Sequence, residues 1–399
     1  MFETVISHIY QKERKICEMA DNKKMQQAKA DKNDEFYTEY STISDEMGHY
    51  REQFEGKTVY CNCDDPTWSN FWKYFHNNFG SLKLKKLIST HYQKDTEPSY
   101  AMIYEGGDDF NLDAGKIVEI EGNTAGSDNE VFYSAGDFRS DDCLKLMEES
   151  DIIVTNPPFS LFRVYIEVLV ASGKRFLVIG NMNAIAYKEV FPLIKNNKVW
   201  LGYNSGNMRF RVPDDYSSSS TVIENGVKYA KFGNTCWFTN LDAKYRHDGL
   251  WHRNGKFDNT QAHCYYEGNE DFYPKYDNYN AIEIAKIKYI PIDYDGVMGV
   301  PISLLDKYNP DEFEIIGYSE AGNPLCFKFY KDMHLVQPLN GGDKPNSKSA
   351  WYAPMIPIIP TDNENYYTAS NSFHKLKKVF TRIFIRNLHP VKKADDLGY

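Results

Sequence analysis

The sequence D-I-I-V-T-N-P-P-F, residues 151–159, is an apolar strand that runs directly into two prolines. Pro157 and Pro158 cannot donate to a sheet ladder and each fixes its own φ, so the strand should end in an extended turn. The Asn156 side chain and the Pro157 carbonyl can then accept hydrogen bonds in one small space. Two acceptors suit an amino group on a ring, and Phe159 offers a flat face for stacking. The same residues, taken alone, also fit an ordinary strand that ends in a Pro-Pro turn.

A second polar turn, Gly136-Asp137-Phe138, lies upstream and precedes a predicted helix over residues 141–149. In an open α/β sheet, ligands gather outside the carboxyl ends of the strands, near the point where the strand order reverses. We therefore expect Asp137 and Asn156 to face the same crevice. Taken by itself, an Asp in such a turn is also a common helix cap.

Further upstream, residues 34–38 read D-E-F-Y-T and are followed by an amphipathic run to about Phe54. A strand over 58–61 then ends in the acidic loop N-C-D-D-P, residues 62–66. This order predicts a helix, a turn, a first strand and an acidic loop. Alternating helices and further strands predict an α/β domain, with strands near 86–90, 175–180, 198–201 and 235–240. Residues 100–104 and 116–121 suggest a hairpin insert.

Several separate segments, taken in order, resemble the EcoRI-type adenine-specific DNA methyltransferases. They are F-Y-T, C-N-C-D-D-P, G-D-F-R-S, T-N-P-P-F-S-L-F-R and M-G-V-P-I-S-L-L-D-K-Y-N-P, and they cover about residues 32 to 330. The resemblance implies a Rossmann-like sheet that binds S-adenosylmethionine, with a C-terminal α+β module for target recognition. It implies site-specific methylation of adenine N6 in double-stranded DNA, on a flipped base, in a restriction-modification or phage/orphan setting.

The resemblance also assigns roles to residues. The catalytic set is Asn156, Pro157, Pro158 and Phe159, and the cofactor set is Phe36, Tyr37, Thr38, Cys61, Asp64, Asp65, Asp137, Phe138 and again Asn156.

The chain departs from the usual methyltransferase pattern after the first strand. Residues 61–66 contain no glycine, although a glycine-rich loop normally lets the backbone approach the donor. We therefore expect Asp64 or Asp65 to receive the ammonium group of the donor, while Tyr37 and Thr38 close over its carboxylate and ribose. The second strand ends without an acidic residue, so His91 or Tyr92 would replace it, although His91 also fits an ordinary strand end.

Composition and charge predict the cellular location, the absence of disulfides and metal, and the residues that contact DNA. No apolar run approaches membrane length and no secretory signal is visible, so we expect a cytoplasmic protein. Seven cysteines without paired zinc-finger spacing predict neither a disulfide framework nor a metal site. The net charge of −10 opposes phosphate binding, yet the C-terminal region is locally basic. The predicted DNA contacts are Lys375, Lys377, Lys378, Arg382 and Arg386, although a solvated charged terminus fits equally well.

Three regions are predicted: a lead-in helix over 1–31, a methyltransferase catalytic domain over 32–245, and a DNA target-recognition region over 246–399. We expect a monomer, with any cognate restriction endonuclease acting as a separate protein. Two alternatives stay open. A protein glutamine-N5 methyltransferase would need the same two acceptors for an amide nitrogen, and a catalytically inactive DNA-binding relative would explain the missing glycines.

Overall fold

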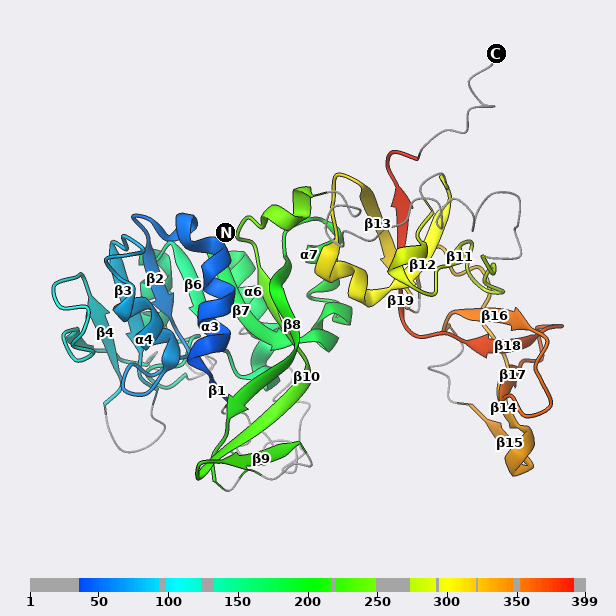
Figure 1. Cartoon of the computed structure of the whole chain (residues 1–399), viewed down its shortest axis with the longest axis horizontal. Coiled ribbons are helices and arrows are strands. Elements are labelled where there is room, and N and C mark those ends of the chain that lie inside the picture. The colour runs from blue at the N-terminus through cyan, green and yellow to red at the C-terminus, as the bar shows by residue number, and fades with distance from the viewer. Residues whose placement is uncertain are drawn as a thin grey trace, which may run out of the picture. The chain divides into compact units, whose positions relative to one another are not determined.

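The computed structural model describes residues 36–92, 98–122, 133–214, 216, 220–248, 273–291, 294–320, 322–346 and 352–390 (Figure 1). The chain forms two compact units, Met1–Ala243 and Lys244–Tyr399. This division falls close to the boundary at residue 245 expected from the sequence. The predicted lead-in helix over 1–31 lies outside the described residues, and the functional labels of the other two regions stay predictions.

The first unit is built on one ten-stranded sheet with the order β1-β8-β10-β7-β6-β2-β3-β4-β5, and β9 pairs with β10. Its strands are β1 (Tyr37–Thr38), β2 (Thr58–Cys61), β3 (Lys86–Thr90), β4 (Tyr100–Tyr104), β5 (Lys116–Glu119), β6 (Ile152–Thr155), β7 (Arg175–Asn181), β8 (Trp200–Arg211), β9 (Thr221–Glu224) and β10 (Val227–Thr239). The four central strands β7, β6, β2 and β3 are parallel. All residues of β2 and β6 are buried, which is why these strands are continuous apolar runs.

The helices of this unit are α3 (Tyr40–Met47), α4 (Asn70–Asn77), α5 (Asp141–Glu149), α6 (Phe162–Ser172) and α7 (Phe191–Lys195). The expected helix over 141–149 is confirmed. Ser69 caps α4 by accepting a hydrogen bond from the Phe71 N–H, at 3.0 Å. The predicted amphipathic run to Phe54 is α3 followed by a 3₁₀ helix, Gly48–Phe54.

The predicted hairpin over 100–104 and 116–121 is present as β4 and β5, but it is not a separate insert. β4 pairs antiparallel with β3, from Leu87 opposite Tyr104 to Thr90 opposite Ala101, so the hairpin extends the main sheet. An exposed edge of β3 would have left a row of backbone groups unpaired, and β4 satisfies them.

The strand predicted near 198–201 corresponds to the start of the longer strand β8, and the strand predicted near 235–240 corresponds to the end of the longer strand β10. β8 and β10 form a long hairpin that projects beyond the rest of the sheet in Figure 1. Its outer part carries β1, with Tyr37 opposite Arg211 and Thr38 opposite Phe210. The F-Y-T segment is therefore a short edge strand of the main sheet.

The second unit contains two small sheets, with the orders β11-β12-β19-β13 and β15-β14-β17-β18-β16. Their strands are β11 (Ile282–Glu283), β12 (Val297–Pro301), β13 (Phe313–Tyr318), β14 (His334–Gln337), β15 (Gly342–Pro345), β16 (Met355–Ile358), β17 (Tyr366–Thr368), β18 (Lys375–Lys378) and β19 (Arg382–Asn387). Within the described residues of this unit the helices are all short 3₁₀ turns, so the α component expected for an α+β module is not found there.

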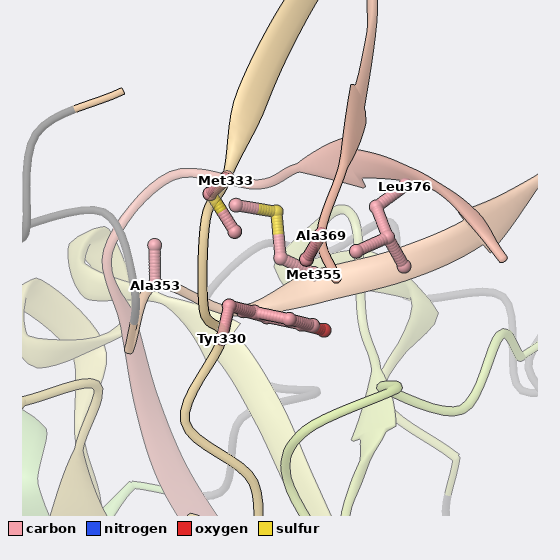
Figure 2. Packing of buried hydrophobic residues seen from close by; sticks show 6 residues of the cluster. All are labelled: Tyr330, Met333, Ala353, Met355, Ala369 and Leu376. Atoms are coloured by element: carbon pink, nitrogen blue, oxygen red, sulfur yellow. The ribbon is translucent and has the colours of Figure 1, made fainter. Parts of the chain in front are cut away.

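A buried cluster supports the five-stranded sheet of the second unit. Figure 2 shows its six side chains: Tyr330, Met333, Ala353, Met355, Ala369 and Leu376. Leu376 is fully buried in the middle of β18, whereas Lys375 and Lys377 on either side are exposed. The two-residue period of a strand thus turns these lysines to solvent.

Candidate active site

The candidate site lies where loops leave the carboxyl ends of the central strands. β2 has β6 on one side and β3 on the other, so the strand order reverses at β2. Ligands of open α/β sheets bind at such a point. The loop after β2 and the N-P-P-F turn after β6 are joined directly, because the Cys63 N–H donates to Thr155 Oγ1 at 3.2 Å.

The amide of Asn156 is held in one orientation. Its Nδ2 donates to the Phe36 carbonyl at 2.7 Å, and its backbone N–H donates to Asp64 Oδ2 at 3.3 Å. Oδ1 is buried and has no hydrogen-bond partner among the described residues. Leaving a buried acceptor unpaired costs about 1–3 kcal/mol, so this oxygen is a strong candidate for a ligand donor.

An aromatic cluster adjoins Asn156; it consists of Phe36, Phe159, Phe210, Tyr216 and Phe232. The Phe36 ring lies 5.5 Å from Phe159, 6.0 Å from Phe210, 5.8 Å from Tyr216 and 4.8 Å from Phe232. All these contacts are tilted or edge-on, and so is the contact of Phe159 with Phe210. Phe210 is fully buried, whereas the other four rings of the cluster are only partly buried.

Asp64 faces the protein interior and not a ligand space. Its Oδ1 accepts a hydrogen bond from Ser69 Oγ at 2.8 Å, and its Oδ2 accepts from Thr155 Oγ1 and the Asn156 N–H. Burial raises the pKa of this carboxyl to about 6, although those three bonds act in the opposite direction. The structure therefore does not support the expected contact between Asp64 and a donor ammonium group. The titratable groups around Asp64 are Asp65, Cys61, Cys63 and Tyr165.

Asp65 is more exposed than Asp64, and its carboxylate has partners in Thr67 and His91. Its Oδ1 accepts from the Thr67 N–H at 2.8 Å and from Thr67 Oγ1 at 2.6 Å. Its Oδ2 lies 3.4 Å from His91 Nε2. The side chain keeps 12% of its surface exposed, so this carboxylate borders solvent at the end of β3. His91 stacks on Tyr100 at 4.8 Å, and its Nδ1 is buried without a partner among the described residues.

The G-D-F turn also lies at the end of β3. Gly136 has φ +82°, and a Cβ there would meet the His91 carbonyl at 2.5 Å, so only glycine fits this approach. The Asp137 carboxylate accepts from Arg139 Nε at 2.9 Å and from a terminal guanidinium nitrogen at 2.8 Å. Asp137 also contributes, after burial and Asp64, to the raised pKa of Cys63, which places it near the loop after β2.

Two residues of the expected cofactor set belong to the core. Cys61 is fully buried in β2, and Phe138 is 3% exposed and packs edge-on against Tyr165 at 4.9 Å. Their side chains are turned into the protein because the strand and the turn need apolar contacts there. Any ligand would meet only their backbone atoms.

The F-Y-T segment lies beside the loop that follows β2. The Tyr37 ring is 4.5 Å from Trp68, and the Thr38 carbonyl accepts from Asn70 Nδ2 at 2.8 Å. Thr38 Oγ1 is buried without a partner among the described residues. The structure thus brings together F-Y-T, the acidic loop and the N-P-P-F turn.

Several residues of this region were missed from the sequence. Ser69 could have been found as the cap of α4, because a serine directly precedes an apolar run. Thr155 stands within the N-P-P-F strand, but nothing local shows that its hydroxyl bridges two loops. Phe210 and Phe232 lie on the long hairpin and carry no sequence signal that connects them with Asn156.

The basic residues of the second unit are divided between its two sheets. Lys375, Lys377 and Lys378 are on β18, whereas Arg382 and Arg386 are on β19. Arg382 is 7% exposed, and its guanidinium is paired with Glu283 at 2.5 Å. Because this guanidinium is buried and held by Glu283, Arg382 is not exposed for the DNA contact that was expected of it.

The remaining four basic residues are exposed. Lys377 pairs with Glu364 at 2.9 Å, Lys375 lies 4.7 Å from the Tyr366 ring centroid, and Arg386 is 3.6 Å from Glu314. Exposed pairs of this kind contribute little stability, so these side chains can exchange partners.

The described ranges contain neither a membrane-spanning helix nor a cluster of metal-binding side chains. No helix there is long and apolar enough to cross a membrane. No group of three or more His, Cys, Asp or Glu side chains in the same ranges is arranged to hold a metal ion.

Asn156 Oδ1 thus lies buried at the switch point of the sheet, without a partner among the described residues and next to the aromatic cluster. The protein belongs to the EcoRI adenine-specific methyltransferase family: the model of that family, described as "Adenine-specific methyltransferase EcoRI", matches residues 24–388. The resemblance found in the sequence motifs is thereby confirmed, and with it the enzyme class of adenine-specific DNA methyltransferases.

Curated relatives agree with the family. The chain is 46% identical over 314 residues to Type II methyltransferase M.EcoRI of Escherichia coli, covering 76% of this chain and 91% of that protein. It is 39% identical over 327 residues to Type II methyltransferase M.MgeORF184P of Mycoplasma genitalium, covering 80% and 93%. It is 36% identical over 295 residues to Type II methyltransferase M.MpnI of Mycoplasma pneumoniae, covering 72% and 83%. No solved structure matches the chain.

Proposed function

We propose that the protein transfers the methyl group of S-adenosylmethionine to N6 of an adenine within one recognition sequence of double-stranded DNA. The observation that carries this proposal is the buried, unpaired Asn156 Oδ1 beside the aromatic cluster. The ten-stranded sheet is the donor-binding domain, and the second unit reads the DNA. As in the relatives that are named Type II methyltransferases, a restriction-modification setting fits this activity.

The residues around Asn156 orient the amine. Because Asn156 Nδ2 donates its hydrogen bond to the Phe36 carbonyl, Asn156 Oδ1 is the amide atom that remains to accept a hydrogen bond from the adenine N6 amine. The Pro157 carbonyl is the second acceptor. Two accepted hydrogen bonds draw the nitrogen lone pair out of conjugation with the ring and point it toward the donor. S-Adenosylmethionine supplies a methyl group on a positively charged sulfur, so alignment matters more than a strong base.

An adenine inside a duplex is stacked and must be flipped out, at a cost of a few kcal/mol. Phe159, with the other rings of the aromatic cluster, offers a stacking surface that offsets part of that cost. Pro158 keeps the turn extended, so that Phe159 begins its short 3₁₀ helix directly beside the amide.

Polar atoms at the strand ends fit the donor. Thr38 Oγ1, Asn62 Nδ2 and His91 Nδ1 are buried without partners among the described residues, and they follow or belong to β1, β2 and β3. Buried polar atoms of this kind are normally paired, so a polar ligand at this edge would satisfy them. In this arrangement Asp65 receives the ammonium group, Asp137 the adenine, and Tyr37 with Thr38 the carboxylate and ribose.

DNA contacts come from the exposed basic side chains of the second unit, namely Lys375, Lys377, Lys378 and Arg386. Phosphate contacts release counterions, so binding should weaken steeply with salt. We propose that the chain acts as a cytoplasmic monomer and that any cognate endonuclease is a separate protein.

The test is transfer of tritiated methyl groups from S-adenosylmethionine to unmethylated genomic DNA, followed by nucleoside analysis. We expect the label in N6-methyladenine. The matched control is the same DNA treated beforehand with this protein and unlabelled donor, which should take up no further label because its sites are filled. Label in protein would support a glutamine methyltransferase, and label nowhere would support an inactive relative; either result overturns the proposal.

A further inference from the structure

We infer that Asp64 is a positioning residue for methyl transfer: its carboxylate holds the backbone of Asn156 against the loop after β2, so that Asn156 Oδ1 stays where the amine must meet it. The inference rests on the proposed function of Asn156 and adds a residue that touches neither donor nor base.

The Asp64 carboxylate joins its own loop to the cap of α4, five residues further on, and to the end of β6 with the N-P-P-F turn, which is distant in the sequence. Oδ2 accepts from Thr155 Oγ1 at the end of β6 and from the Asn156 N–H at 3.3 Å. Oδ1 accepts from Ser69 Oγ at 2.8 Å, and Ser69 Oγ in turn accepts from the Phe71 N–H as the cap of α4. The Asp64 side chain therefore fixes the position of the N-P-P-F turn relative to both β2 and α4.

The backbone of the same residue is held as well. Ser89 Oγ on β3 donates to the Asp64 carbonyl, and Thr155 Oγ1 accepts from the neighbouring Cys63 N–H at 3.2 Å. The Thr155 hydroxyl thus accepts from the loop after β2 and donates to Asp64 at once. A bridge of several hydrogen bonds between the same two loops leaves little freedom for the turn.

Direct contact with the donor is a poorer explanation of Asp64. The residue is 5% exposed, and both of its oxygens already accept hydrogen bonds from the protein. An ammonium ligand would have to enter a space from which the protein already excludes solvent, beside the hydroxyls of Thr155 and Ser69. Asp65 is the more exposed of the two, with 12% of its side-chain surface accessible, although its oxygens also have partners in Thr67 and His91.

The opposite end of the same strands offers a matched control. Asp151 precedes β6, and its Oδ2 accepts from the Thr58 N–H, the first residue of β2, at 2.8 Å. Asp151 therefore also ties β2 to β6 through a carboxylate and a backbone N–H. It does so at the amino ends of the strands, away from the loops that form the candidate site.

The experiment compares Asp64→Asn, Asp151→Asn and the wild type for kcat at saturating donor and acceptor, for the dissociation constant of S-adenosylmethionine, and for thermal stability. A misplacement of about 1 Å in the reacting groups can cost about 100-fold in rate, so we expect a kcat loss of up to that order for Asp64→Asn. Donor affinity should stay within about threefold, because a residue acting only through Asn156 makes no ground-state contact with the donor. Asp151→Asn should keep the wild-type kcat.

Thr155 provides a second pair in case Asp64→Asn does not fold. Thr155→Val removes the bridging hydroxyl at nearly constant volume and should lose kcat, whereas Thr155→Ser keeps the hydroxyl and should retain it.

Three outcomes would overturn the inference: a large loss of donor affinity in Asp64→Asn with kcat preserved, an equal kcat loss in Asp151→Asn, or equal kcat in Thr155→Val and Thr155→Ser. Rates are measured on whichever acceptor the wild type labels, DNA or protein. A wrong acceptor would therefore refute the proposed function without touching the role of Asp64, and a wild type that labels neither would overturn both.

Discussion

Replacing Asn156 by alanine is the most direct perturbation of the candidate site. The substitution removes Oδ1, the proposed acceptor for N6, and also the Nδ2 donor that binds the Phe36 carbonyl at 2.7 Å. Loss of one preorganised group that acts on the reacting atom typically lowers kcat by about 10²–10³-fold. Loss of the bond to Phe36 should lower the free energy of unfolding by about 1–2 kcal/mol, since a partly buried carbonyl is left unpaired.

Both effects can be measured separately. Initial rates of tritium transfer to DNA at saturating donor give kcat, equilibrium dialysis gives donor affinity, and thermal denaturation gives stability. The matched control is Asn196→Ala, because Asn196 Nδ2 also donates to a backbone carbonyl at 2.7 Å, that of Pro192, but on the surface. Asn196→Ala should leave kcat unchanged. A kcat for Asn156→Ala within about threefold of the wild type would refute the proposed role, because no acceptor of N6 would then have been removed.

Three further predictions concern charge. Burial raises the pKa of Asp64 to about 6, so the contribution of this carboxyl to the free energy of unfolding is largest at pH values below its ordinary pKa and is lost as the pH rises through about 6. Methyl transfer should change in the opposite direction and fall below about pH 6, because protonation of Asp64 removes an acceptor for Thr155 and Asn156. Rate and melting profiles that follow the same pH dependence would contradict this prediction. Arg382→Ala should lower the free energy of unfolding by about 3–5 kcal/mol, because the buried Glu283 carboxylate then keeps the Tyr276 hydroxyl but loses its cationic partner; urea denaturation measures this, and a change in DNA affinity alone would be inconsistent with the burial of Arg382. Lys375→Ala and Lys378→Ala should each reduce the slope of log K against log[salt] for DNA binding by about 1 without changing thermal stability, and an unchanged slope would exclude phosphate contact.

Local patterns predicted the elements around the site well. The helix over 141–149 and the strands over 58–61 and 86–90 appear with the expected bounds, since apolar runs, caps and turns act between near neighbours. The N-P-P-F turn was located for the same reason. The length of β8 and β10 was underestimated, because their outer halves are half-exposed and lack a continuous apolar run.

The direction of individual side chains could not be predicted in the same way. Asp64 and Asp65 are adjacent acids in one loop, yet one is enclosed by Thr155 and Ser69 while the other borders solvent. Arg382 is similar in sequence context to the exposed lysines of β18, but its strand packs so that the guanidinium meets Glu283.

The sequence by itself determined the family, the order of the central strands along the chain, and the turn that presents Asn156. Only the tertiary structure decided that Phe36 orients the Asn156 amide, that Asp64 is a structural bridge, and that the basic residues lie on two sheets. The physical reason is the range of the interactions. Periodicity and turn chemistry depend on neighbours in the chain, whereas burial and hydrogen-bond partners depend on which distant segments pack together.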